Sequence, residues 1–238
     1  AKNKALLGVM FFSLVGMIGA SVVNGLNTYL FKDYFGNVKI MAVSGGLSVL
    51  YSLITFAITQ PLADKLGKKE WCCWGAGFAA AVFALLFFFP IHNPVLFIVI
   101  NGVCYLGASG MQVLIWAMVN DSIDYHELQT GERNEGIVYS TYSFFRKLAS
   151  AVSGSLSSFV LGFIGYNVAE GAMQTAEVSN AIWKSYTGIY VLGYGVAVAI
   201  LFFVYPLTKA KTTEMLEQLK ARRAEKASAM ETDGEQCP

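Results

Sequence analysis

The sequence predicts an all-α integral membrane protein in which six transmembrane helices form one bundle. Two observations carry this prediction. Of the 238 residues, 55% are hydrophobic and 14% are charged, whereas soluble chains are about 45–50% apolar and about 25% charged. The apolar residues also fall into long continuous runs, and a helix needs about 20 mostly apolar residues to cross a bilayer. These runs lack the short alternating pattern of membrane β-strands.

Six apolar runs are long enough to be spans. They cover residues 5–31, 40–62, 71–89, 94–119, 136–164 and 182–206. The segments that separate them read KDYFGNVK (32–39), DKLGKKE (64–70), PIHNP (90–94), NDSIDYHELQTGERNEG (120–136) and YNVAEGAMQTAEVSN (166–180). The first, second and fourth runs stop where charged residues begin. Proline ends the third and the sixth, because the residue before a proline disfavours helix.

The chain therefore divides into two parts. Residues 1–207 form the six-helix bundle, and residues 208–238 form a charged, solvated helical tail. Two groups of three helices suggest a 3+3 repeat, an arrangement common in transporters. Residues 107–110, GASG, lie inside the fourth predicted helix. Small residues there either loosen that helix or let a neighbouring helix approach closely.

The distribution of positive charge predicts the orientation. Six spans place both termini on one side of the membrane. That side carries Lys2, Lys4, Lys65, Lys68, Lys69, Arg133 and the lysines of the tail, whereas the opposite side carries Lys32, Lys39 and Lys184. The positive-inside rule places both termini, and the acidic stretch 120–136, in the cytoplasm. We expect a multi-pass protein of the cell's inner (plasma) membrane that contacts lipid and binds no nucleic acid.

Metal sites are not predicted. The four cysteines include the adjacent pair Cys72 and Cys73, and no spacing of cysteines suits zinc. His126 and Glu127 begin an H-E-x-x-H pattern, but Thr130 stands where the second histidine belongs. We therefore expect no metal ligands in this chain.

Arg146 and Lys147 lie inside the fifth predicted helix. Lys147 is about 15 Å from the cytoplasmic end of that helix, close to the middle of a ~30 Å hydrocarbon core. A cation there costs about 2.5–3.5 kcal/mol, so neither side chain should face lipid. No carboxylate lies in the middle of any predicted span. The pair is expected to meet water, a ligand or an acid on another segment.

Polar residues at helical spacing suggest a shared hydrophilic path. In the fifth helix such a face consists of Ser143, Lys147, Ser150, Gly154 and Ser157. Similar rows in the other helices consist of Ser44, Ser48, Ser52, Thr55 and Thr59; of Asn101, Tyr105, Gln112 and Trp116; and of Asn24, Asn27 and Thr28. Any single row is equally explained by hydrogen bonds between helices. Hydroxyls, amides and aromatic rings together also suit a sugar site.

The stretch 120–136 permits three interpretations. It contains five carboxylates and one arginine. The three are a metal or general-acid site, such as the magnesium site that membrane prenyltransferases build from N-D-x-x-D-x-x-x-D; a plain solvated loop; and a charged latch on a moving part. Leu128 replaces the last aspartate of the prenyltransferase pattern, and no second aspartate-rich repeat exists. Asp121, Asp124 and Glu127 share one side of a helix end beside the basic DKLGKK segment, which favours the latch.

The motif D-S-I-D-Y-H-E-x5-R-N-E-G, followed by YSTYSFFRK and LGFIGY, resembles the glycoside–pentoside–hexuronide:cation symporters. These form the melibiose-permease-like branch of the major facilitator superfamily. PLADKLGKK (61–69) is similar to the superfamily's cytoplasmic loop motif, with Gln60 where a glycine is usual. The resemblance covers the whole chain and half of the family's twelve-helix protein. It implies the second six-helix bundle of a major facilitator fold.

The resemblance also implies roles for individual residues. The substrate cavity is expected to include Lys147, Tyr142, Ser143, Gln112 and Asn24. The cytoplasmic gate is expected to include Asp121, Asp124, Tyr125, Glu127, Arg133, Glu135, Asp64 and Lys65. Gln112 stands where melibiose permease has a tryptophan, which implies a different sugar preference.

The expected function is secondary active transport, not catalysis. The chain is expected to be the C-terminal half of a sugar:cation symporter that works by alternating access. No cofactor is expected, and the coupling cation, sodium or proton, would be bound mainly by an N-terminal six-helix bundle in the same polypeptide or a partner. The alternative is a polytopic membrane enzyme of the prenyltransferase type that uses NDSID with magnesium.

Overall fold

The computed structural model describes residues 4–133, 135–169 and 173–234. Parts of the predicted bundle and tail, among them Lys2 and residues 235–238, lie outside the described residues. Within the described residues the secondary structure is helical, as expected. The α-helices are α1 (Lys4–Tyr29), α2 (Val38–Leu66), α3 (Lys68–Phe88), α4 (Pro94–Ala108), α5 (Gly110–Thr130), α6 (Glu135–Phe163), α7 (Ala176–Phe203) and α8 (Lys209–Gly234). A π-helical segment, Leu30–Tyr34, continues α1.

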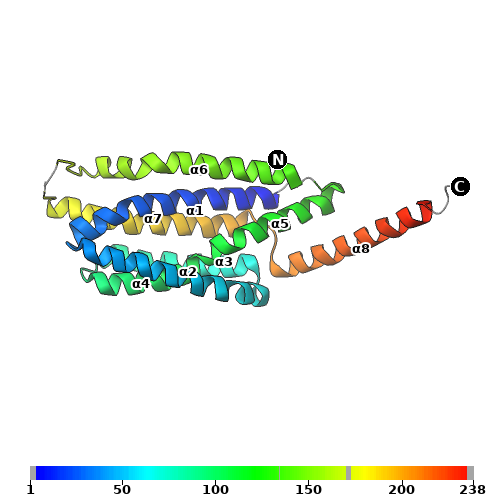
Figure 1. Ribbon diagram of the computed structural model, residues 1–238, viewed down its shortest axis with the longest axis horizontal. Coiled ribbons are helices and arrows are strands. Elements are labelled where there is room, and N and C mark those ends of the chain that lie inside the picture. The colour runs from blue at the N-terminus through cyan, green and yellow to red at the C-terminus, as the bar shows by residue number, and fades with distance from the viewer. Residues whose placement is uncertain (1–3, 134, 170–172, 235–238) are drawn as a thin grey trace.

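The helices form an elongated bundle from which α8 projects (Figure 1). α1 packs against both α6 and α7, and α3 packs against α7 and α4. α6 lies at one edge of the bundle, with α1 as its main neighbour. The beginning of α1 and the whole of α8 lie toward the same end of the bundle (Figure 1).

Side-chain caps set several helix boundaries. Asn37 accepts a hydrogen bond from the backbone N–H of Ile40 at the start of α2. Asn93 caps α4 in the same way, with Pro94 at the first helical position. Thr175 caps α7, so this helix begins at Ala176, six residues before the predicted start. Such caps satisfy N–H groups that would otherwise lack partners.

The fourth predicted span, 94–119, is divided by a single residue, Ser109, into α4 and α5, and Pro94–Thr130 as a whole is long and apolar enough to be one span. The geometry supports the close approach of a neighbouring helix, because an added Cβ on Gly75 of α3 would collide with the backbone carbonyl of Gly107. The small residues thus allow α3 to approach this segment closely.

The helix also continues beyond its predicted end. α5 runs through the acidic stretch as far as Thr130 and stops at Gly131, whose φ is +78°. Glycine adopts this left-handed conformation without the steric penalty of a Cβ. Residues 120–130 are therefore helical, which fixes the spacing of their carboxylates.

Five segments among the described residues are long and apolar enough to cross a membrane. They are Lys4–Tyr34, Val38–Leu66, Lys68–Phe88, Pro94–Thr130 and Ala176–Phe203. α6 has 29 residues but is not among them, and it carries Arg146, Lys147 and many hydroxyl groups. The count of six spans remains a prediction.

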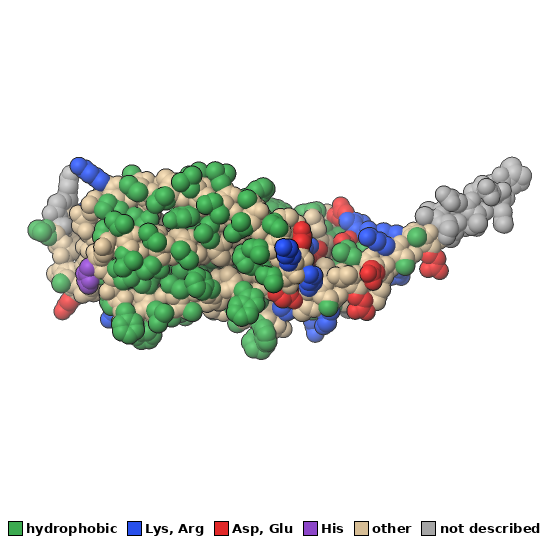
Figure 2. Space-filling view, turned by 90° about the horizontal axis from the view of Figure 1, so that it is seen from below, with side chains coloured by type: hydrophobic (Ala, Val, Ile, Leu, Met, Phe, Trp, Pro, Cys, Tyr) green, Lys and Arg blue, Asp and Glu red, His purple; other side chains and the backbone are tan. Residues whose placement is uncertain are grey.

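The buried side chains form two apolar clusters, one toward each end of the bundle. Met118 and Leu114 belong to the cluster nearer α8, and Trp183 and Phe97 belong to the other. Large apolar side chains, including Phe56 and Trp74, are also exposed on the outside. Figure 2 shows hydrophobic side chains over the body of the bundle, with most charged side chains of this face gathered near α8.

Candidate functional site

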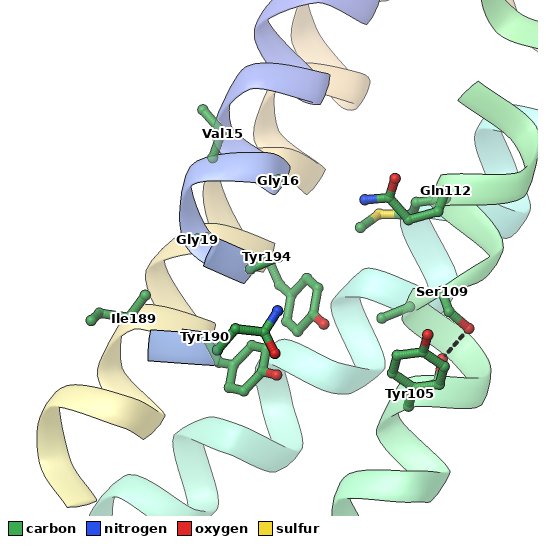
Figure 3. Close-up of a pocket in the computed structure, with 14 residues that line it drawn as sticks. Val15, Gly16, Gly19, Tyr105, Ser109, Gln112, Ile189, Tyr190 and Tyr194 are labelled. Carbon is green, nitrogen blue, oxygen red and sulfur yellow. Dashed lines mark hydrogen bonds between the residues drawn. The ribbon is translucent and has the colours of Figure 1, made fainter. Parts of the chain in front are cut away.

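A pocket of about 150 Å³ opens between α1, α4, α5 and α7. Its polar groups are supplied by Asn24, Tyr105, Ser109, Gln112, Tyr190 and Tyr194. Figure 3 shows the rings of Tyr190 and Tyr194 on one side of the pocket, with Tyr105, Ser109 and Gln112 facing them. Amides and phenol groups on an otherwise apolar wall can bind the hydroxyls and the apolar face of a small polar ligand.

The tyrosines of α7 are held in place by stacking. The ring of Tyr190 stacks on Phe83, with centroids 4.2 Å apart, and is nearly parallel to the ring of Tyr194, with centroids 5.4 Å apart. One turn earlier, the hydroxyl of Tyr186 accepts a hydrogen bond from the amide of Asn101. These contacts fix one wall of the pocket before any ligand binds.

Glycines of α1 create the space. A Cβ added to Gly16 would meet no atom within 4 Å, although Gly16 lines the pocket. At Gly19 an added Cβ would lie 3.9 Å from the Cα of Gly193, where α1 and α7 approach each other. The absence of side chains therefore keeps the pocket open on the α1 side.

A second recess, of about 340 Å³, lies along α6. It is lined by Trp116, Ser143, Arg146, Lys147 and Ser150. The guanidinium carbon of Arg146 lies 5.7 Å from the centroid of the Trp116 ring, within the range of a cation–π contact.

The five predicted cavity residues are divided between these features. Asn24 and Gln112 line the pocket between α1 and α7, and Ser143 and Lys147 line the recess on α6. Tyr142 is buried, and its hydroxyl is hydrogen-bonded to Ser13 at 3.1 Å. Tyr142 thus fixes α6 to α1 instead of facing open space.

The acidic stretch is the centre of an ion-pair cluster at the α8 end of the bundle. Lys68, at the start of α3, contacts both carboxylate oxygens of Asp121 at 2.8 and 2.7 Å. Arg133 pairs with Asp124 and Glu127 of α5. The expected pairing between the acidic stretch and the DKLGKK segment is therefore present through Lys68.

Arg133 also pairs with Glu135 at the start of α6. Hydrogen bonds to Glu135 and Glu127 raise the pKa of Arg133 above its ordinary value. The arginine therefore stays protonated at any physiological pH, and a change in pH would act on this cluster through its other members.

α8 adds a second arginine to the same carboxylates. Arg223 pairs with Glu127 and Asp124, and the pKa of Arg223 is raised mainly by its hydrogen bond to Glu127. The neighbouring Arg222 donates to the backbone carbonyl of Leu128. The tail is thus attached to the end of α5.

Three other predicted gate residues lie outside these ion pairs. Asp64 accepts a hydrogen bond from Gln60. Lys65 contributes its backbone carbonyl, which accepts from the side chain of Lys209. Tyr125 packs against the apolar cluster nearer α8. Among the residues that the structure describes, no group of three or more His, Cys, Asp and Glu side chains is placed to hold a metal ion.

Sequence reasoning missed two kinds of residue. Tyr190 and Tyr194 were not proposed for the cavity, although their spacing from Tyr186 at i+4 and i+8 was a readable signal. Lys68 and Arg223 were not proposed for the cluster. Nothing in the sequence says which lysine of 64–70, or which arginine of the tail, reaches the carboxylates.

Comparison with known proteins identifies the family. The family model described as MFS/sugar transport protein matches residues 1–209. The chain belongs to this family. The resemblance inferred from the stretch 120–136 is thereby confirmed, and so is an all-helical membrane protein of the major facilitator superfamily.

Curated relatives agree with this assignment. An uncharacterized symporter, YjmB, of Bacillus subtilis (strain 168) is 30% identical over 91% of this chain. An isoprimeverose transporter of Lactiplantibacillus pentosus is 30% identical over 90%, and a glucuronide carrier protein homolog of Escherichia coli (strain K12) is 25% identical over 93%.

The matched regions cover 47%, 44% and 48% of these relatives, so the chain spans about half the length of the curated relatives it matches. The family and the names of its relatives are those of transporters, and they give no support to the alternative of a prenyltransferase-type enzyme.

Proposed function

We propose that this chain is the C-terminal six-helix half of a sugar:cation symporter that works by alternating access. The observation that carries the proposal is the tyrosine- and amide-lined pocket inside an apolar bundle of this family. The names of relatives, a glucuronide carrier homolog and an isoprimeverose transporter, support a sugar or glycoside as the substrate. An N-terminal six-helix bundle would supply the rest of the translocation path.

The coupling cation, sodium or proton, would be bound mainly by that N-terminal bundle. The exposed positive charges in the middle of α6 support the assignment of the cation site to the N-terminal bundle, because they repel a further cation from the present chain. The membrane is proposed to be the inner (plasma) membrane, with both termini in the cytoplasm. The basic segments near Lys4, Lys65 and Lys209 support that orientation through the positive-inside rule.

The ion-pair cluster would serve as the cytoplasmic latch. Its pairs join α3, α5, the start of α6 and α8, so they hold four elements at one end of the bundle. Apart from Lys68–Asp121, whose carboxylate is buried, the pairs involve exposed arginines and are individually weak. Several weak contacts that break together suit a gate that opens and closes in every transport cycle.

Uptake by the complete protein tests the proposal. The protein would be reconstituted into liposomes, and accumulation of a labelled glucuronide and of isoprimeverose would be measured with an imposed sodium or proton gradient. Accumulation that disappears when an ionophore collapses the gradient is expected. Sugar flux that does not depend on the sodium or the proton gradient, or no flux of either sugar, would refute symport.

A further inference from the structure

A groove of about 660 Å³ lies on the outside of the bundle, between α3 and the end of α7. Trp74 of α3 and Phe202 of α7 line it, and these side chains are 75% and 67% exposed. Phe78 and Ala81 continue its apolar wall along α3. A Cβ added to Gly77, which also lines the groove, would meet no atom within 4 Å. The groove therefore has room for a hydrocarbon chain.

The groove faces away from the tyrosine pocket. Phe83 of α3 is buried and stacks on Tyr190, so its side of α3 faces the pocket. Trp74 precedes Phe83 by about two and a half helical turns and therefore lies on the opposite side of α3. Phe78 and Leu85 are exposed on that same opposite side. A second bundle that completes a path through the pocket would lie on the pocket side, which leaves the groove facing membrane lipid.

The length of the groove matches one leaflet of a bilayer. α3 is among the segments that are long and apolar enough to cross a membrane. Lys69 lines one end of the groove and Ala81 the other, and the rise along α3 between them is about 18 Å. Half of a hydrocarbon core is about 15 Å thick. A lipid with its headgroup at Lys69 would therefore place one acyl chain along the whole groove.

The end of the groove near α8 is basic. The side-chain nitrogen of Lys69 donates to the backbone carbonyl of Tyr205 at 2.6 Å, and an ammonium group has further N–H donors for a ligand. Lys211 in the first turn of α8 is exposed and lies close enough to Lys69 for their charges to interact. Glu70 also lines the groove, but its Oε1 accepts a hydrogen bond from the backbone N–H of Lys209. The lysines at this end outnumber the carboxylate.

We propose that this groove binds an anionic phospholipid. The phosphate would lie against Lys69 and Lys211, and one acyl chain would follow Trp74, Phe78 and Ala81. Basic pockets between transmembrane helices bind anionic headgroups, and tryptophan is enriched at the level of the headgroups. A zwitterionic lipid fits the same apolar wall but carries no net charge to interact with the lysines. The inference adds a lipid site to the proposed transporter and does not depend on which sugar it carries.

Fluorescence quenching of Trp74 in the complete protein tests the proposal. The protein would be reconstituted into phosphatidylcholine vesicles with a minor share of phosphatidylglycerol, and one lipid or the other would carry bromine atoms on its acyl chains. The contribution of Trp74 is the difference between the parent and Trp74→Phe. Per molecule in the membrane, we expect brominated phosphatidylglycerol to quench Trp74 at least about fivefold more than brominated phosphatidylcholine does. Fivefold is about the effect of one lysine at an anionic membrane surface.

Lysine variants locate the preference for the anionic lipid. Lys211→Gln should lower it about fivefold. Lys69→Gln should do the same, but it also removes the hydrogen bond to Tyr205. Lys211 has no side-chain hydrogen bond to another described residue, so Lys211→Gln remains a test if Lys69→Gln does not fold. Lys220→Gln is the matched control, because this exposed lysine lies about 13.5 Å further along α8, beyond the ~10 Å screening length.

A second control moves the fluorescent probe. Leu85→Trp in the Trp74→Phe background places an indole on the same exposed side of α3 but outside the groove. The two brominated lipids should quench it equally. A preference as large as that at Trp74 would mean that anionic lipid gathers around the whole bundle and not in the groove.

Three further results would overturn the inference. Equal quenching of Trp74 by both lipids would reduce the groove to general contact with the bilayer. No quenching by either lipid would mean that protein covers the groove. A preference that survives Lys69→Gln and Lys211→Gln, or that Lys220→Gln lowers equally, would not come from this site. Failure of sugar transport would leave the inference standing, because quenching reports lipid contact alone.

Discussion

The contact between Lys68 and Asp121 gives a quantitative test of the ion-pair cluster. The lysine nitrogen contacts both carboxylate oxygens, and the Asp121 side chain is only 8% exposed, whereas Lys68 is 30% exposed. Removing one partner of a fully buried pair costs about 3–5 kcal/mol. Because water can reach the lysine side, we expect Lys68→Gln to lower the free energy of unfolding by about 2–3 kcal/mol.

The reverse substitution should cost less. In Asp121→Asn, Lys68 can turn toward water, so a loss of about 1 kcal/mol is expected. The double variant places two neutral amides in contact, and its loss should fall short of the sum by about 2 kcal/mol. Reversible unfolding in mixed detergent micelles measures these free energies. Lys65→Gln is the control, since Lys65 has no side-chain ion pair among the described residues.

A coupling free energy below about 0.5 kcal/mol would refute this reasoning, because that is the limit for independent sites. It would mean that the carboxylate is solvated or protonated in the folded protein. In that case Lys68 would lie near Asp121 without stabilising the bundle, and the proposed latch would lose its most buried pair.

Three further substitutions give independent tests. Arg223→Gln should loosen α8, because it removes the ion pairs between α8 and α5. Hydrogen exchange should then be faster in the backbone amides of α8 and unchanged in those of α5. Unaltered exchange in α8 would contradict its attachment to α5. Gly75→Ala should cost about 1–3 kcal/mol in unfolding free energy, because the new Cβ would collide with the carbonyl of Gly107; a stability equal to the parent would contradict the close approach. Gly16→Phe should reduce sugar affinity at nearly constant stability, whereas Gly77→Phe, which also has open space but lies outside the tyrosine pocket, should leave binding unchanged.

Much of the fold was readable because transmembrane helices satisfy their own backbone hydrogen bonds, so apolar length alone indicates them. The interruption at Ser109 was suggested by GASG but not decided, since small residues have two uses. The predicted span begins six residues after α7 because Glu177, Ser179 and Asn180 interrupt the apolar pattern, and only the cap by Thr175 shows that helix begins at Ala176. Boundaries depend on such local bonds more than on hydropathy.

The site was only partly readable for a different reason. Asn24, Gln112 and Lys147 were identifiable because a polar side chain in an apolar helix needs a partner or water. Tyr190 and Tyr194 were harder to identify. Their spacing from Tyr186 places them on one helix face, but tyrosine is compatible with an apolar environment and lines a pocket only through packing. Pairing within the charged cluster depends on how helices cross, which no spacing in the sequence encodes.

α5 connects the two features on which the proposed function depends. Gln112 and Trp116 line the cavities, and Asp121 belongs to the ion-pair cluster, on one uninterrupted helix. Nine residues separate Gln112 from Asp121, a rise of about 13.5 Å. Ser109, which separates α4 from α5, itself lines the pocket, so α5 runs from the pocket to the ion-pair cluster. Coupling between distant sites requires such an element shared by both. Lys68→Gln should therefore change sugar affinity as well as stability, and an affinity unchanged by it would show that α5 does not link the latch to the pocket.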